Sequence, residues 1–133
     1  MSIVTRILLA LGAVMFAACG APTHAGFVFP DTIGVWKLKA KRDLAATDAP
    51  ESVRRLGLKR VQSGEYEGPG RIAAQVYDMT SSSGAFEAEQ TWKAAANTVA
   101  FHKEQYFTVI HWEDAERTAV PTFVREIEKL LGP

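Results

Sequence analysis

The alternation of apolar and polar residues predicts five strands, because a half-buried strand has a period of two. They cover residues 35–41, 58–67, 71–79, 98–101 and 106–112. In the first strand the apolar side chains share one face, and the other face carries three lysines: Lys37, Lys39 and Lys41. Between the second and third strands, Gly-Pro-Gly is a strong turn signal, so these two strands are expected to form an antiparallel hairpin.

The fourth and fifth strands predict a second hairpin, whose register depends on its loop. A three-residue loop places Phe101 beside the apolar Phe107 and Val109 on one face. A two-residue loop pairs Phe101 with Thr108 instead and buries less apolar surface. We favour the three-residue loop, because shifting the register by one residue moves every side chain of a strand to the other face.

Apolar residues at helical spacing predict a helix over residues 85–96, capped at its N-terminus by Ser82 or Ser83. A closing helix begins near Pro121, a favoured first-turn residue, and runs to Leu131. Both helices have one apolar stripe, so each is expected to cover part of a sheet.

A short helix over residues 51–56 completes the order of elements: strand, short helix, two strands, helix, two strands, helix. Two hairpins and two one-sided helices predict an α+β fold. We expect a single domain over residues 31–133, with an antiparallel sheet of about five strands and two main helices packed on one face.

The first residues have the layout of a bacterial export signal, with Arg6 followed by an apolar run over residues 7–18. Cys19 follows two alanines and is the only cysteine in the chain. The end of this segment resembles the lipobox of bacterial lipoproteins. The resemblance implies that residues 1–19 are a signal peptide, that Cys19 is lipidated, and that the protein is held in the cell envelope, facing the periplasm or the outside.

Two alternatives stay open, because Phe16 stands where lipoboxes usually have leucine. Ordinary signal peptidase would cut after Ala25 and release a soluble domain, whereas an uncleaved segment would keep Met1. The apolar run is shorter than the roughly 20 residues that a spanning helix needs. Residues 20–30 show neither a strand nor a helix period and are expected to be a tether.

Three short segments resemble the signature of an uncharacterised family of exported bacterial domains. They are Gly34-Val35-Trp36, Tyr77-Asp78-Met79 and Ala85-Phe86. The resemblance covers roughly residues 29–109. It implies an exported domain of this fold, and it implies no catalytic residue, because the family has no known activity.

Basic and acidic residues are balanced over the chain, with a formal net charge of zero, but they are unevenly distributed. Residues 37–60 hold eight basic and three acidic side chains, a net charge of +5. Residues 61–133 hold six basic and eleven acidic ones, a net charge of −5. A neutral chain is a poor nucleic-acid binder, so we expect no nucleic-acid partner.

Catalytic and metal-binding patterns are weak, and we predict neither a catalytic residue nor a cofactor. Asp78 and Glu87 are the best carboxylate pair for a hydrolase, with His111 as a further candidate. Zinc needs three or four ligands, and the three histidines, with His24 in the predicted tether, do not supply them.

The sequence therefore favours a non-enzymatic, membrane-anchored accessory or binding lipoprotein, whose partner is a membrane-protein complex or an anionic envelope component. The expected binding residues lie on one sheet face: Lys37, Lys39, Lys41, Lys59, Arg60 and Tyr77. The alternatives are a soluble periplasmic ligand-binding module and a small hydrolase that uses Asp78 and Glu87.

Overall fold

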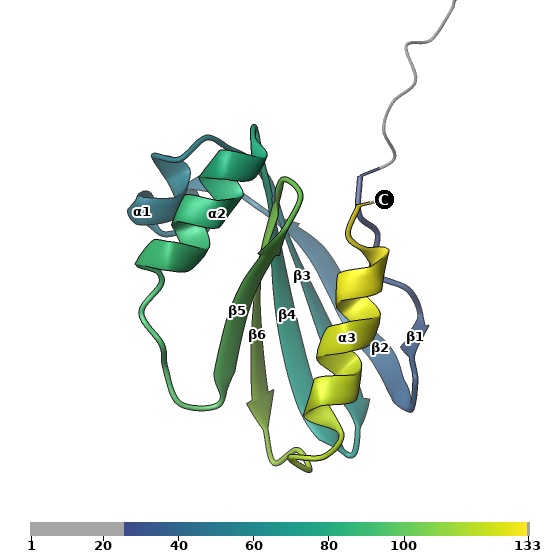
Figure 1. Cartoon of the computed structure of the whole chain (residues 1–133). Helices are drawn as coiled ribbons and strands as arrows, with labels where there is room; N and C mark the ends of the chain where they lie inside the picture. The colour runs from purple at the N-terminus through teal and green to yellow at the C-terminus, as the bar shows by residue number, and fades with distance from the viewer. Residues whose placement is uncertain (1–25, 133) are drawn as a thin grey trace, which may run out of the picture.

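The computed structural model describes residues 26–132, which form an α+β domain on a curled, six-stranded antiparallel sheet (Figure 1). The strands are β1 (Thr32–Ile33), β2 (Trp36–Leu44), β3 (Leu58–Gly68), β4 (Gly70–Met79), β5 (Thr98–Lys103) and β6 (Tyr106–Glu113). Their order across the sheet is β1-β2-β3-β4-β6-β5. The predicted fold class is confirmed; the sixth strand is the two-residue β1.

Three α-helices and one 3-10 turn complete the domain: η1 (Ala46–Asp48), α1 (Glu51–Arg54), α2 (Ser82–Thr91) and α3 (Val120–Leu130). The cap of α2 is Ser81, whose hydroxyl accepts a hydrogen bond from the backbone of Gly84 at 3.0 Å. Helix α2 ends five residues earlier than the expected residue 96. Trp92 packs on Phe107 there, with ring centroids 5.5 Å apart, so the chain turns away at that point.

The two main helices lie against opposite faces of the sheet, which corrects the expectation that both cover one face. Side chains alternate along β4, with even-numbered residues in one core cluster and odd-numbered residues in another. The even-numbered residues pack with Phe123 and Ile127 of α3, and the odd-numbered ones with Ala85 and Ala88 of α2. In Figure 1, α1 and α2 accordingly stand together on one side, apart from α3. We call these the α3 face and the α2 face.

The segment before β1 is part of the domain, so the folded region begins earlier than the expected residue 31. Phe27 and Phe29 are buried in the core of the α3 face. The ring of Phe29 lies over Gly64, where a Cβ atom would come within 2.7 Å of it. Tyr66 then donates a hydrogen bond to the carbonyl oxygen of Pro30 at 2.7 Å. The expected tether over residues 20–30 is therefore wrong for its described part, 26–30.

The β5–β6 hairpin has a two-residue loop, so the favoured three-residue register is wrong. Phe101 pairs with Thr108, and Lys103 pairs with Tyr106. Glu104 adopts a φ of 51° to close the turn. The expectation assumed that one face of β6 is exposed, but its residues 106–110 are buried on both faces. Burial on both sides removes the apolar preference for one register.

Residues 1–25, with the predicted signal segment, Cys19 and His24, lie outside the described residues. Within residues 26–132, none of the helices combines the length and apolar character needed to cross a bilayer.

Candidate functional site

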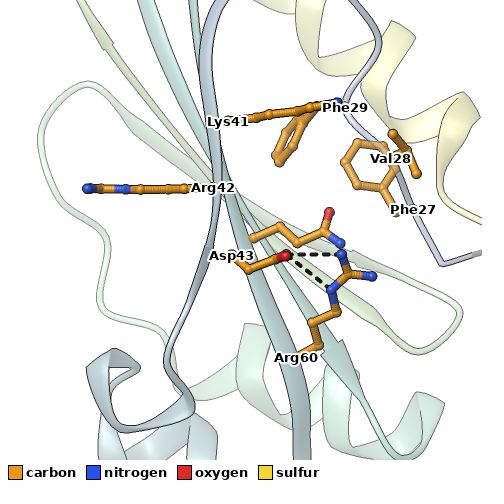
Figure 2. A pocket seen from close by; sticks show the side chains of 8 residues that line it. Phe27, Val28, Phe29, Lys41, Arg42, Asp43 and Arg60 are labelled. Atoms are coloured by element: carbon orange, nitrogen blue, oxygen red, sulfur yellow. Dashed lines mark hydrogen bonds and ion pairs between the residues drawn. The ribbon is translucent and has the colours of Figure 1, made fainter.

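A hollow of about 220 Å³ lies at the start of the described chain, and we call it the N-terminal hollow (Figure 2). Its lining comes from the N-terminal segment, β2 and β3: Phe27, Val28, Phe29, Lys41, Arg42, Asp43, Arg60 and Gln62. The basic side chains on its side of the sheet are Lys41 and Arg60, with the acidic Asp43 beside them. Val28 is 64% exposed at the rim. An exposed apolar side chain among cations suits an anionic, partly apolar surface.

A bulge in β2 decides which of its side chains reach the N-terminal hollow. The register against β3 shifts between Leu38 and Ala40, which leaves Lys39 as the extra residue. One extra residue reverses the alternation of the strand beyond it. Lys41 therefore turns toward the hollow, whereas Arg42 points away from it to the other side of the strand (Figure 2).

The expected face of three lysines is consequently wrong. Lys37 pairs with Glu67 in register, and Lys39 forms an ion pair with the same Glu67 at 3.3 Å. Lys41 pairs with Gly64 and lies with the buried Phe29 on the α3 face. The bulge thus separates Lys41 from the other two lysines, so the three cannot act on one planar partner.

Arg60 is held at the floor of the N-terminal hollow by Asp43. Its Nε and Nη2 atoms donate to Oδ1 of Asp43 at 3.3 and 3.0 Å (Figure 2). Both side chains are about half exposed or more, at 47% and 69%, so the pair contributes little to stability. The pair with Asp43 orients the guanidinium of Arg60. Lys41, the other basic side chain of the hollow, has no ion-pair partner within the described residues.

Asp78 lies beside Arg60 on the neighbouring strand, and the two residues pair in register. Its Oδ1 atom is buried and has no hydrogen-bond partner in the described part of the chain. Burial raises the pKa of Asp78, and the charges of Lys59 and Arg60 act in the opposite direction. Lys59 itself is exposed at a register shift in β3. Arg60 thus lines the N-terminal hollow together with Lys41, whereas Lys59 is not among its lining residues.

The proposed hydrolytic pair is not brought together. Asp78 lines a small cavity with Phe27 and Tyr106 on the α3 face. Glu87 is an exposed residue of α2, which covers the α2 face. Carboxylates on opposite faces of a sheet cannot flank one glycosidic bond.

Tyr77 does not belong to a binding surface, contrary to expectation. It is 2% exposed, and its hydroxyl donates to Oε1 of Gln75 at 2.8 Å. Its ring packs against Phe107 at 5.5 Å, and burial raises the pKa of the phenol. Helices cover both faces of the sheet. The side chain of Tyr77, which points away from the core of the α3 face, is therefore buried in the core of the α2 face.

His102 and His111 lie on the same face of the β5–β6 hairpin, four positions apart. His102 contacts Glu89 of α2, whereas His111 lies 3.6 Å from Glu113. Across residues 26–132, no group of three or more metal-binding side chains comes together.

A second hollow, of about 260 Å³, lies on the part of the α2 face that the helices leave open. It is lined mainly by charged residues of four strands: Lys39, Glu65, Tyr66, Glu67, Arg71, Ile72, Ala73, His111 and Glu113. Lys39 and Arg71 each have a carboxylate partner at 3.3 Å. The lining carries two basic and three acidic residues besides His111, so this hollow presents both charge signs.

Sequence reasoning missed the contribution of the N-terminal segment. Its signal is present in Phe27-Val28-Phe29, where two apolar residues flank the exposed Val28 with a period of two. The bulge that redirects Lys41 has no such signal in the sequence, because the strand exposes its lysines whether or not it contains the extra residue.

Comparison of the chain with protein-family models, curated proteins and solved structures finds no match. The resemblance to a family of exported bacterial domains therefore stays a prediction.

Proposed function

We propose that the protein is a non-enzymatic accessory or binding lipoprotein of the bacterial envelope, anchored through Cys19. In this proposal the N-terminal hollow faces the membrane and contacts anionic head groups or an acidic patch of a membrane-protein complex. One observation carries it: the described residues begin beside the hollow that Lys41 and Arg60 line, so a lipidated Cys19 would hold the domain from this side.

Chain length permits this orientation. Cys19 precedes Gly26 by seven residues. A fully extended chain spans at most about 3.5 Å per residue, so a lipidated Cys19 would keep Gly26 within about 25 Å of the bilayer. A basic residue near an anionic membrane surface contributes about 1 kcal/mol to binding, and this attraction falls off within roughly one Debye length. Lys41 and Arg60, whose side chains line the hollow, are the cations placed to use it.

The experiment starts with the intact mass of the protein recovered from membranes of its native host. The proposal expects a mature chain that begins at a lipidated Cys19, and it expects Cys19→Ala to prevent this processing. A mature chain that begins at Gly26, or one that retains Met1, would contradict the anchor.

Charge reversal tests the orientation separately. Lys41→Glu should lower the recovery of the native membrane partner by crosslinking, or the binding to vesicles that contain anionic lipid. Lys93→Glu is the matched control, since it changes the same charge at an exposed position in the loop after α2. An equal loss of binding for the two variants would mean that binding depends on the net charge of the protein and not on the hollow.

The soluble ligand-binding module is the second candidate, and the hollow on the open α2 face favours it. Its side chains present both charge signs, which suits a zwitterionic small molecule. A melting temperature that rises with such a ligand, in a protein recovered without lipid, would support this alternative.

A further inference from the structure

The outer edge of β5 is an unpaired strand edge. Within residues 26–132, strand β5 is the last of the sheet and pairs with β6 alone. The amide of Trp112 donates to the carbonyl oxygen of Asn97 at 3.0 Å, which makes these two a hydrogen-bonded pair. Such pairs alternate along an antiparallel ladder, so the backbone groups of Thr98, Ala100 and His102 point away from β6.

Strand β5 carries none of the features that usually protect an edge. It runs six residues, from Thr98 to Lys103, without a proline or a register shift. Its single formal charge, on Lys103, is turned toward α3, where Nζ donates to the carbonyl oxygen of Glu128 at 3.0 Å. The side chains of all six residues are half-buried. Val99 and Phe101 border the core of the α3 face and stay partly open.

We propose that β5 pairs with β5 of a second copy of this chain, in antiparallel orientation about a two-fold axis through Ala100. In this register Thr98 lies opposite the second copy's His102, and Val99 lies opposite its Phe101. Each residue whose backbone groups point outward then lies opposite another such residue of the second copy. The register therefore satisfies the free N–H and C=O groups on both strands. The half-buried Val99 and Phe101 gain apolar neighbours.

Charges are compatible with this arrangement. Lys103 would lie opposite Asn97, and Glu104 opposite Ala96, so no like charges are brought together. Phe86 of α2 is 48% exposed and stands against His102, with ring centroids 5.4 Å apart. The second copy's Thr98 would be placed next to it.

The other edge of the sheet limits this assembly to a dimer. Strand β1 has two residues, and β2 beyond it carries the bulge and the exposed Lys39, Lys41 and Arg42. An edge of this kind resists pairing. Pairing through β5 alone gives a closed two-fold dimer, whereas pairing through both edges would give a filament.

Disulfide trapping in membranes of the native host tests the register on the full-length chain. Ala100→Cys places two thiols on the axis, where paired Cα atoms are about 5.5 Å apart, within the range that a disulfide spans. Thr98→Cys is the matched control, because its two copies lie four residues apart along the strands, about 13 Å. With an added oxidant, we expect a covalent dimer for Ala100→Cys above the level that Cys19 gives in the parent chain.

Equal dimer yields for Ala100→Cys and Thr98→Cys, or a yield for Ala100→Cys no higher than the parent's, would overturn the proposal. Light scattering of the full chain in detergent gives a second measurement. Ala100→Pro removes an outward-pointing amide and leaves the ladder with β6 intact, so a folded variant should have half the parent's mass. A parent chain that is monomeric at every concentration tested would also contradict the dimer.

Discussion

The two edges of the sheet differ in their exposed charge and in the regularity of their strands. The β1–β2 edge is interrupted by a bulge, carries exposed lysines and an arginine, and has the N-terminal segment packed beside it. The β5 edge is regular and has no exposed formal charge before Lys103. Since charge and irregularity are what keep strand edges from pairing, the first edge is protected and the second is available.

This difference assigns the two proposals to separate parts of the molecule. The basic edge carries exposed cations and a bulge, so it suits an anionic surface better than another strand. The β5 edge has free backbone and half-buried apolar side chains, so it suits another strand. Each proposal can fail without the other.

The largest expected effect is on the free energy of unfolding, when a phenylalanine at each edge of the sheet is truncated. Phe29→Ala should lower the free energy of unfolding by about 3–5 kcal/mol, because its ring is 3% exposed and fills the space over Gly64. Phe101→Ala, at the half-buried edge, should cost about half as much in the monomer. Denaturant unfolding of both variants measures the difference. Similar losses for the two would mean that the N-terminal segment and the β5 edge are equally packed.

A smaller effect is expected for the hydrogen bond that ties the N-terminal segment to the sheet. Tyr66→Phe leaves the carbonyl oxygen of Pro30 without its donor and should lower the free energy of unfolding by about 1–2 kcal/mol. Tyr77→Phe is the matched control on the other face, and it should cost less, because Gln75 is only half-buried and can bind water. Amide exchange should rise at residues 27–29 and 31 in the Tyr66 variant alone. Unchanged exchange there would show that the segment is held by its phenylalanines.

The smallest expected effect is electrostatic and depends on pH. Burial raises the pKa of Asp78, so the folded chain binds its proton more tightly than the unfolded chain does. The free energy of unfolding therefore falls as the pH rises from the ordinary carboxyl pKa through the raised one. Asp78→Asn removes this loss and should be more stable than the parent at pH 7, by less than about 1 kcal/mol, because solvent screens a partly exposed group.

The gain from Asp78→Asn should shrink as the pH approaches the ordinary carboxyl pKa, about 3.9. Thermal melts of the parent and the variant between pH 7 and pH 4 measure it, with the exposed Asp48→Asn as the control. A variant that is less stable than the parent at pH 7 would show that attraction by Lys59 and Arg60 outweighs burial.

Much of the fold was predictable, because local signals carry it. The Gly68-Pro69-Gly70 turn, the apolar stripe of α3 and the five longer strands are each specified within about ten residues. The sites were less predictable. Lys41 and Arg60 line one hollow and Lys59 does not, Tyr77 is core, and Lys37 and Lys39 lie on the opposite face from Lys41.

The errors share one physical cause. A period of two says which side chains share a face, but it does not say what covers that face. With α2 on one side of the sheet and α3 on the other, both alternation sets of β4 and β6 are buried. Tyr77, taken as exposed, and the hairpin register, chosen for one-sided burial, were both misjudged for this reason.

The sequence by itself determined the α+β class, the hairpins, the helices and the uneven charge, because each follows from the residues of one short stretch. Tertiary structure decided which face each helix covers, how the N-terminal segment packs, and on which side of β2 each lysine lies. These outcomes depend on contacts between residues far apart in the chain, and on one bulged residue whose energy cost is set by the strand beside it. No local pattern records such a contact, so only the folded chain shows one edge of the sheet protected and the other open.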